Sequence, residues 1–432
     1  MIRYLPGVVG GLNTIACRTS EAPADNPARA VGNMWDDVRA QFRLSPDIID
    51  LSALYISSHP RPVREAIERH RRGLDENPTV YLESEISRQH NRVMEAAAGY
   101  LGGDPDQIAL TDSTTMGLAL VYQGFRLKPG QEFLVSDRNY YSTTESVRLA
   151  AARSGARVRY VSLYEDGASA SVSAGQLVDS LLSGVNEATG VLAVTWVHSS
   201  TGVKLPIARI ADRLSEINRE RAPDEHLLLC VDAVHGFGVE DEEAAALGCD
   251  FYIAGCHKWL FGPRGTGIIW GSHHGWNAVE PSIPSFMDQS LWRAWMERRE
   301  PSGRTNGPRM SPGGFKPYEH QWAMAEAFEF HQKIGKANVA ARTHELSRQL
   351  KEGLAGIPGV TLHTPMQEDL SSGIVCFEVR GHSPRAVVRR LRDRNIIATT
   401  TPYSPSYPRI TPSIRNTPHE IETALRAIRE LA

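Results

Sequence analysis

The chain has 432 residues, 41% of them hydrophobic and 22% charged, with a formal net charge of −3. This length exceeds what one hydrophobic core usually supports, so we expect a large domain with a smaller companion. The slightly negative charge and the scattered arginines argue against nucleic acid as a partner. No stretch approaches the roughly twenty uninterrupted apolar residues of a membrane-spanning helix.

The five cysteines are odd in number and show neither a CxxC pair nor metal-ligand spacing. We therefore expect no bound metal and a reducing, cytoplasmic location. The first thirty residues hold a short apolar stretch interrupted by Pro6, three glycines and Asn13. This makes a poor export signal, and an arm that packs on the body or on a partner subunit is favoured over export or lipidation of Cys17.

Helical and strand patterns alternate along the next part of the chain. Segments 60–74, 87–102, 141–155 and 206–220 have helical spacing of apolar residues, and 108–125 is typical of a strand, a polar turn and a helix. Short apolar strands are expected at 131–137, 156–163, 191–199, 226–233 and 250–256. Such alternation indicates an α/β fold with a parallel sheet buried on both faces, whose ligands bind at the carboxyl ends of the strands.

A domain boundary is expected in the Trp- and Pro-rich stretch 275–318. Beyond it we predict a helix from 320, another over 341–359, strands at 360–364 and 373–379, and helices at 383–395 and from about 418. The expected organisation is an N-terminal arm and first helix (1–45), a large domain (46–310) and a small α+β domain (311–432).

Two segments carry the most chemical information. GCHKWLFGPRGTG (255–267) places Lys258 between a histidine and a glycine-rich turn, and VDAVHGFG (231–238) places Asp232 at the end of a wholly apolar run. A buried amine and a buried carboxylate at the ends of adjacent strands need a charged, planar partner. Pyridoxal 5'-phosphate is such a partner, because its aldehyde condenses with lysine and its ring nitrogen needs an acid.

With these motifs the chain resembles, over roughly residues 50–430, the class V aminotransferase family of fold type I pyridoxal-phosphate enzymes. HKWL, GPRGTG and the late segment R-x-x-x-S-x-R-N-T (409–417) are similar to isopenicillin N epimerase-like proteins, hercynylcysteine sulfoxide lyases and lincosamide-pathway enzymes that act on cysteine conjugates. The resemblance implies a large pyridoxal-phosphate-binding domain with a mainly parallel central sheet flanked by helices, a smaller C-terminal α+β domain, and a homodimer.

The resemblance also implies roles for individual residues around the cofactor. Lys258 would form the Schiff base and shuttle the α-proton, Asp232 would pair with the ring nitrogen, and His235 would bond the phenolic oxygen. The remaining positions form the surroundings of the cofactor: Ser113, Thr114, Thr115 and His257 at the phosphate, Tyr140 (or Tyr141) stacked on the ring, and Ser199 (with Ser200) where many relatives have an asparagine.

Arg409 matches the arginine that binds the substrate carboxylate, and Arg415 is the reserve candidate. Taken without the resemblance, each of these residues also fits a structural role: a surface lysine or arginine, a helix-capping aspartate, a buried histidine or a core tyrosine.

Two departures from the family pattern bear on function. Cysteine desulfurases of this class use a cysteine on the loop before the arginine, whereas this loop, TTTPYSPSYPR (399–409), has none. Cys376 lies in an apolar strand, where a thiol is more often core than nucleophile. Many relatives carry a Gly-Thr pair that reaches the partner's phosphate, where this chain has Gly313, Gly314 and Phe315.

We therefore expect an enzyme acting at the α-carbon of an amino acid, as an epimerase or a C–S or β-elimination lyase, with a cysteine conjugate in secondary metabolism as a candidate substrate. An oxidative decarboxylase or deaminase and an aminotransferase are the alternatives. A catalytically silent scaffold of the same fold is the alternative from another class.

Overall fold

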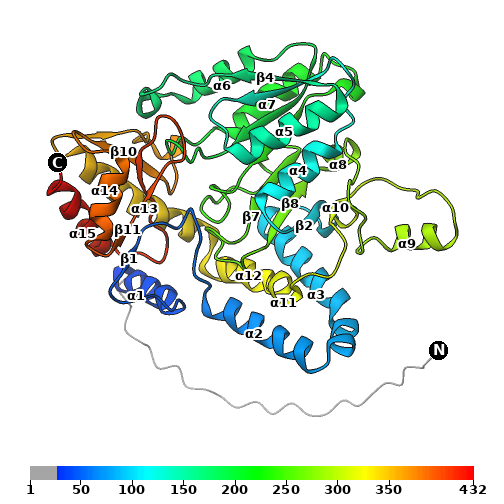
Figure 1. Ribbon diagram of the computed structural model, residues 1–432, viewed down its shortest axis with the longest axis horizontal. Helices are drawn as coiled ribbons and strands as arrows, with labels where there is room; N and C mark the ends of the chain where they lie inside the picture. Colours follow the sequence, from blue (N-terminus) through cyan, green and yellow to red (C-terminus); the bar gives the residue numbers. More distant parts are fainter. Residues whose placement is uncertain (1–26) are drawn as a thin grey trace, which may run out of the picture.

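The computed structural model describes residues 27–432, so the predicted arm with Cys17 lies outside the described residues. Its centre is a seven-stranded sheet in the order β2-β8-β7-β6-β5-β3-β4 (Figure 1). The strands are β2 (Ile108–Thr111), β3 (Glu132–Ser136), β4 (Arg157–Val161), β5 (Thr189–Thr195), β6 (Leu228–Asp232), β7 (Phe251–Gly255) and β8 (Gly267–Gly271). No helix within 27–432 combines the length and apolarity needed to cross a membrane.

All six predicted strands of the large sheet are present: the five short apolar strands, each within a few residues of its expected bounds, and the strand that opens segment 108–125, which is β2. β3 to β7 pair in parallel, whereas β8 runs antiparallel to both of its neighbours, β2 and β7. The sheet is therefore mainly parallel rather than wholly so. β8, with the sequence GIIWG, was not predicted, because a short strand with a glycine at each end is specified by the two strands that pair with it.

Alternate residues of the strands enter two separate hydrophobic cores. In β6, Leu229 and Val231 join the core that includes α3 (Pro78–Leu101), α7 (Ile207–Asn218) and α12 (Met324–Ile334). Leu228 and Cys230 join the core beneath α4 (Thr114–Gly124) and α5 (Tyr141–Ser154). Since both faces are buried, continuous apolar strands are the expected pattern, and the prediction of a sheet covered on both sides is confirmed.

A second, antiparallel sheet has the order β12-β13-β10-β9 and lies on the side of the molecule opposite α9 (Figure 1). Its strands are β9 (Val360–Leu362), β10 (Val375–Val379), β12 (Thr399–Thr400) and β13 (Pro408–Ile410). Helices α13 (Lys336–Ala355), α14 (Pro384–Arg392) and α15 (Pro418–Arg429) share its hydrophobic core. The short strand β1 (Ile49–Asp50) pairs in parallel with β11 (Ile396–Ile397) beside it.

The proposed boundary at residue 310 lies near three short helices, α9 (Gln289–Met296), α10 (Gly307–Met310) and α11 (Tyr318–Trp322). α9 projects from the body on a long excursion of the chain (Figure 1). Although α11 and α12 follow the boundary, they pack on α2 (Arg61–Glu76) and α3 of the larger part. The division into residues 1–45, 46–310 and 311–432 stays a proposal. The packing of α11 and α12 favours a boundary closer to the start of α13.

A buried ionic cluster joins the two parts. Glu240, which follows β6, accepts a hydrogen bond of 2.7 Å from Lys204 Nζ and one from Ser372 Oγ. His344 of α13 lies 3.2 Å from the same carboxylate. Burial alone would raise the pKa of Glu240, but His344 and Lys204 outweigh it and lower the pKa to about 2. The carboxylate is therefore ionised at neutral pH and links the end of β6 to α13.

Candidate functional site

Ten of the residues predicted from the sequence line one cavity of about 410 Å³. It lies at the carboxyl ends of β5, β6 and β7, the edge where ligands bind in parallel sheets. The predicted residues that line it are Ser113, Thr114, Thr115, Tyr140, Ser199, Asp232, His235, His257, Lys258 and Arg409. Others that complete the lining, among them Leu54, Tyr55, Ile56 and Pro402, were not predicted.

Lys258 follows β7 by three residues, lines the cavity and is partly buried. Desolvation and, to a smaller extent, Arg409 lower the pKa of its amine to about 8, against the attraction of Asp232, which acts in the opposite direction. At pH 7 roughly a tenth of such amines are neutral, far more than for an exposed lysine of pKa about 10.4. At neutral pH this amine is therefore more often in its nucleophilic, neutral form than the amine of an exposed lysine.

Asp232 is the last residue of β6 and is buried. Its carboxylate accepts hydrogen bonds from Thr143 Oγ1 at 3.1 Å and from the backbone N–H of Val234 at 3.3 Å. Burial raises its pKa, although Lys258 acts in the opposite direction. A buried carboxylate with only two neutral donors is suited to a cationic partner placed in the cavity.

His235 is held in one tautomer by a neighbour that the sequence analysis did not identify. The indole N–H of Trp259 donates to His235 Nδ1 over 3.3 Å. Burial, and then Lys258, hold the pKa of His235 well below its usual value, so the ring is neutral. The hydrogen of a neutral ring whose Nδ1 accepts must be on Nε2, which leaves His235 as a hydrogen-bond donor.

The opposite end of the cavity is built to hold an anion. Ser113 caps α4, accepting a hydrogen bond from the backbone N–H of Met116 at 3.1 Å, and Thr114 and Thr115 begin the helix, where free N–H groups and the dipole favour negative charge. Nδ1 of His257 is buried without a hydrogen-bond partner. A Cβ at Gly255 would lie 3.0 Å from both His257 Cε1 and Thr114 Oγ1, so a larger residue there would press on both side chains.

These groups fit pyridoxal 5'-phosphate. A phosphate matches the start of α4 with the unpartnered nitrogen of His257, a phenolic oxygen matches the donor on His235, and a protonated ring nitrogen matches Asp232. The amine of Lys258 lies in the same cavity, as an aldehyde requires.

Arg409 and Arg415, the two candidates for the substrate carboxylate, have different surroundings. Arg409 is 4% exposed and donates only to neutral oxygens: the Ser199 carbonyl at 2.6 Å, Thr399 Oγ1 at 3.0 Å and the Thr400 carbonyl at 3.4 Å. None of the ion pairs within the described residues involves it. Its charge is therefore available to an anionic ligand, and desolvation lowers its pKa.

Arg415 does not line the cavity. It is 1% exposed, lies 3.3 Å from the carboxylate of Asp50, and places its guanidinium over the ring of Phe261. Because Asp50 already compensates its charge, Arg415 is suited to joining β1 to the C-terminal segment, and we do not assign it to the substrate.

Tyr140 lines the cavity with a 42% exposed side chain, whereas the fallback Tyr141 is 71% exposed and does not. The ring of Tyr140 meets Tyr403 edge to face at 6.3 Å. Tyr403 was not predicted as a site residue. It lies on the loop 399–409, where desulfurases carry their cysteine, and its hydroxyl is 2.7 Å from Ser199 Oγ. Its position on that loop was the only feature of the sequence that could have pointed to it.

The structure also places Cys376 and Phe315, the residues connected with the two departures from the family pattern. Cys376 is buried within β10, and burial raises the pKa of its thiol to about 12, so it is neither accessible nor ionised. Phe315 is 82% exposed and does not line the cavity. Within the described residues no cluster of His, Cys, Asp and Glu has the geometry of a metal site.

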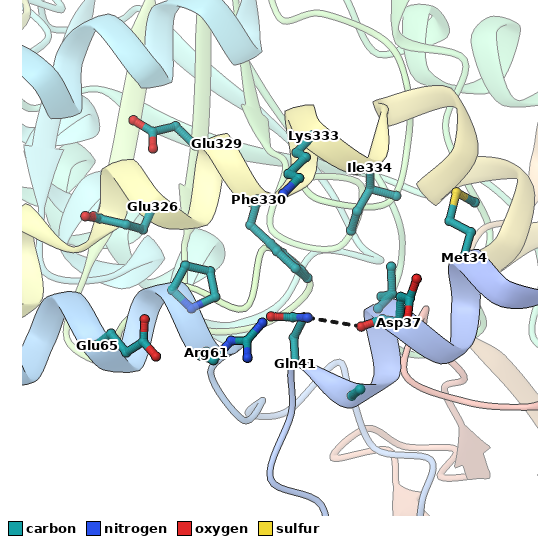
Figure 2. Close-up of a pocket in the computed structure, with 13 residues that line it drawn as sticks. Met34, Asp37, Gln41, Arg61, Glu65, Glu326, Glu329, Phe330, Lys333 and Ile334 are labelled. Atoms are coloured by element: carbon teal, nitrogen blue, oxygen red, sulfur yellow. Dashed lines mark hydrogen bonds between the residues drawn. The ribbon is translucent and has the colours of Figure 1, made fainter.

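A larger cavity, of about 910 Å³, lies between α1 (Pro27–Ala40), α2 and α12 (Figure 2). Figure 2 shows Phe330 of α12 pointing toward α1 and α2. Of its acids, Glu326 is paired with Arg69 and Arg92, and Glu329 with Arg92. None of the predicted site residues lines it. Size is therefore a poorer guide here than the convergence of perturbed titratable groups.

Known proteins resemble this chain in sequence. The family described as aminotransferase class-V matches residues 57–405. Isopenicillin N epimerase from Streptomyces clavuligerus is 27% identical over 399 residues, covering 91% of this chain and 97% of that protein. The enzyme of the same name from Amycolatopsis lactamdurans is 28% identical over 408 residues, covering 93% and 100%.

Solved structures resemble it in fold. A mutant of C-DES with glycine covalently linked to its pyridoxal-phosphate cofactor gives a TM-score of 0.78 at 22% identity, covering 91% of this chain and 99% of that one. Cysteine desulfurase from Thermococcus onnurineus NA1 gives 0.76 at 21% identity, covering 92% and 97%. The architecture is that of fold type I pyridoxal-phosphate enzymes. Because the family match spans most of its length, the chain belongs to the aminotransferase class-V family.

Proposed function

We propose that this chain uses pyridoxal phosphate to act at the α-carbon of an amino acid, as an epimerase or as a lyase that eliminates a β-substituent or cleaves a C–S bond. The observation that carries the proposal is the composition of one cavity. A desolvated lysine, a buried carboxylate and an arginine without an anionic partner line it together.

The bound cofactor supplies an aldehyde for an amine and an electron sink for the α-carbon. The chain's own residues do the rest. Lys258 binds the cofactor and, when released from it, carries a proton to or from the α-carbon. Asp232, positioned by Thr143, keeps a cation at the ring nitrogen, and His235 donates a hydrogen bond from Nε2.

Substrate orientation comes from Arg409. With its carboxylate held by the guanidinium, an amino acid has its α-carbon placed toward Lys258 in the same cavity. Because Arg409 would fix the carboxylate, it would also set which bond of the α-carbon the bound cofactor weakens, and so would bear on the choice between loss of a proton and loss of the carboxylate.

Two observations favour epimerisation or elimination over desulfuration. Two proteins that match this chain in sequence over nearly their whole length, at 27% and 28% identity, are named isopenicillin N epimerase. The loop 399–409 has no cysteine, and the cysteines that the structure describes are all buried, with a raised pKa at Cys376, so none of these thiols is placed to accept sulfur. A cysteine conjugate from secondary metabolism remains our candidate for a lyase substrate.

We also propose that the protein is a cytoplasmic homodimer, as the family resemblance implies. Light scattering on the purified protein tests the dimer, and a monomer at micromolar concentration would contradict it.

Incubation of the cofactor-loaded protein with amino acids in deuterated water tests the reaction. Deuterium at the α-carbon with inversion and no other product indicates an epimerase, and pyruvate with ammonia indicates a β-eliminating lyase. Peroxide would indicate an oxidase, and a keto acid formed with the cofactor in its amine form an aminotransferase. A colourless protein that borohydride cannot link to the cofactor at Lys258 would instead be a silent scaffold.

A further inference from the structure

A tyrosine that the proposed chemistry does not use lies beside the cavity of Lys258. Tyr403 is on the loop between β12 and β13, and its hydroxyl is 2.7 Å from Ser199 Oγ. Its ring meets that of Tyr140 edge to face, with the ring centroids 6.3 Å apart. Ser199 and Tyr140 both line the cavity, as does Pro402, the residue before Tyr403. The phenol is therefore held against the wall of the cavity by two residues of that wall.

The loop that carries Tyr403 is fastened at its base. The backbone N–H of Thr401 donates to the carbonyl of Tyr407 at 2.9 Å, and the N–H of Tyr407 donates to Thr401 Oγ1 at 2.9 Å. Ser406 Oγ donates to the Thr401 carbonyl at 2.6 Å. Tyr403 lies between these anchors and is only partly exposed. The fold itself therefore sets the position of the phenol.

Ser199 connects this phenol to the group that we assign to the substrate carboxylate. The Ser199 carbonyl accepts the 2.6 Å hydrogen bond from Arg409 Nη1, and the Ser199 hydroxyl is bonded to that of Tyr403. In an amino acid the α-carbon is bonded directly to the carboxylate. A substrate held by Arg409 therefore presents its α-carbon close to the residues that Ser199 joins.

The order of the strands places Lys258 and Tyr403 on opposite sides of Asp232. Along the sheet, β7, β6 and β5 are consecutive neighbours. Lys258 follows β7, Asp232 ends β6, and Ser199, the partner of Tyr403, follows β5. Adjacent strands are about 4.8 Å apart, so β7 and β5 are separated by roughly 10 Å. A planar molecule that stands over Asp232 would have the amine on one side and the phenol on the other.

Inversion of an α-carbon needs proton transfer on two faces. A proton leaves one face, and the electron pair of that bond takes up another proton on the opposite face. A single amine cannot serve both faces without crossing the plane of the molecule, whereas a base and an acid on opposite sides can. Burial raises the pKa of Tyr403, against the hydrogen bond of Ser199 and the charge of Arg409, so its hydroxyl is protonated at neutral pH. The side of the cavity away from Lys258 therefore has a proton donor.

We propose that Tyr403 is the second proton-transfer residue of an amino-acid epimerase and exchanges a proton with the face of the α-carbon opposite Lys258. Lys258 Nζ takes the α-proton from one face, and Tyr403 Oη gives its proton to the other. The amine gains one proton and the phenol loses one, and both return to their starting states by exchange with water. Ser199 Oγ donates a hydrogen bond to the phenolate meanwhile. The inference rests on the epimerase form of the proposed function.

The test measures exchange of the α-hydrogen and inversion separately. The cofactor-loaded protein is incubated in deuterated water with the amino acid that the wild type inverts; NMR reports deuterium at the α-carbon, and chiral chromatography reports the inverted isomer. Tyr403→Phe keeps the ring but removes the proton, so inversion should fall by roughly 10²- to 10⁴-fold. Deuterium should still enter the isomer whose α-hydrogen faces Lys258, with its configuration retained. An equal loss of exchange and inversion would overturn the proposal.

Binding provides a readout that does not depend on turnover. The dissociation constant of L-norvaline, measured from the change in visible absorption, should stay the same in Tyr403→Phe. A tyrosine that only held the substrate carboxylate would instead raise this constant roughly two- to tenfold when its hydrogen bond is lost. Weaker binding with undiminished inversion would therefore show that Tyr403 only binds the substrate, and overturns the proposal.

Three further variants separate the alternatives. Ser199→Ala should lower the ratio of inversion to exchange roughly two- to tenfold, because the phenolate loses one hydrogen bond. Tyr160→Phe is the matched control, since Tyr160 is 52% exposed on β4 and does not line the cavity. If Tyr140→Phe, and not Tyr403→Phe, separates exchange from inversion, the second proton comes from Tyr140 and the proposal fails.

The wild-type protein distinguishes failure of this inference from failure of the proposed function. A protein that eliminates a β-substituent without inverting any amino acid overturns the inference together with the epimerase form, while the lyase form stands. If no amino acid changes the visible spectrum of the cofactor-loaded protein, the proposed function itself fails.

Discussion

Replacement of Arg409 by glutamine should weaken the binding of amino acids far more than that of amines. Arg409 is 4% exposed, and the hydrogen bonds from its three guanidinium nitrogens go only to neutral oxygens. A bound carboxylate would therefore be the first anion to pair with its charge. Two unit charges about 4 Å apart attract by about 4 kcal/mol at an effective dielectric constant near 20. Desolvation of the carboxylate offsets part of this, which leaves about 2–4 kcal/mol.

That free energy corresponds to a roughly 30- to 700-fold increase in the dissociation constant for an amino acid. The assay titrates the cofactor-loaded protein with L-norvaline and with butylamine, which is the same molecule without the carboxylate. Butylamine should bind to Arg409→Gln about as it binds to the wild type. Arg409→Lys should give an intermediate loss, because lysine keeps the charge but not the planar fork.

Arg415→Gln is the control, since its partner is Asp50 and it does not line the cavity. Arg415→Gln should lower the free energy of unfolding but leave the ratio of the norvaline and butylamine dissociation constants unchanged. Equal weakening of norvaline and butylamine by Arg409→Gln, or a loss specific to norvaline in Arg415→Gln, would refute the assignment.

Three further predictions concern other parts of the structure. The rate at which the apo protein captures the cofactor should rise with pH, with a midpoint at about pH 8, because Lys258 loses its proton there. Asp232→Asn should lower this midpoint, because the attraction of the carboxylate raises the pKa of the amine. A midpoint that stays fixed in stopped-flow absorbance would contradict the pairing. Trp259→Phe should weaken cofactor retention roughly two- to tenfold, measured by equilibrium dialysis, because His235 loses its tautomer-fixing bond; undiminished retention would exclude this role. The pKa of Glu240 falls from 4.5 to about 2 on folding, so its ionisation should contribute about 3 kcal/mol to the free energy of unfolding above pH 4.5, and this contribution is lost as the pH falls to about 2. In urea unfolding, Glu240→Gln should therefore be less stable than the wild type at pH 7, with a smaller difference near pH 2. Equal stability at pH 7 would contradict the linkage.

The sequence was sufficient for the parts of the site that depend on local pattern. Asp232 ends an apolar run and Lys258 follows another, and such runs become buried strands whose last residues face the ligand edge of the sheet. The turn at Ser113 precedes a helix, which is a local feature as well. These positions could be predicted because strand burial and helix capping are set by residues adjacent in the chain.

Residues that act through partners distant in the chain could not be predicted in this way. Thr143 reaches Asp232 across 89 positions, and Tyr403 reaches Ser199 across 204. No periodicity or local spacing encodes such pairings, because they depend on how separate elements pack. β8 is a similar case, since its pairing with β2 and β7 specifies it more than its own five residues do.

The sequence by itself determined the alternation of apolar strands and amphipathic helices, and with it the sheet, its ligand edge and the amine and carboxylate placed there. Only the tertiary structure distinguished Arg409 from Arg415, which are six positions apart and of identical chemistry, by the surroundings of each guanidinium. The physical reason is charge compensation: folding brings Asp50 to Arg415 and leaves Arg409 buried among neutral oxygens. The binding capacity of a charged group depends on what the fold has already placed beside it.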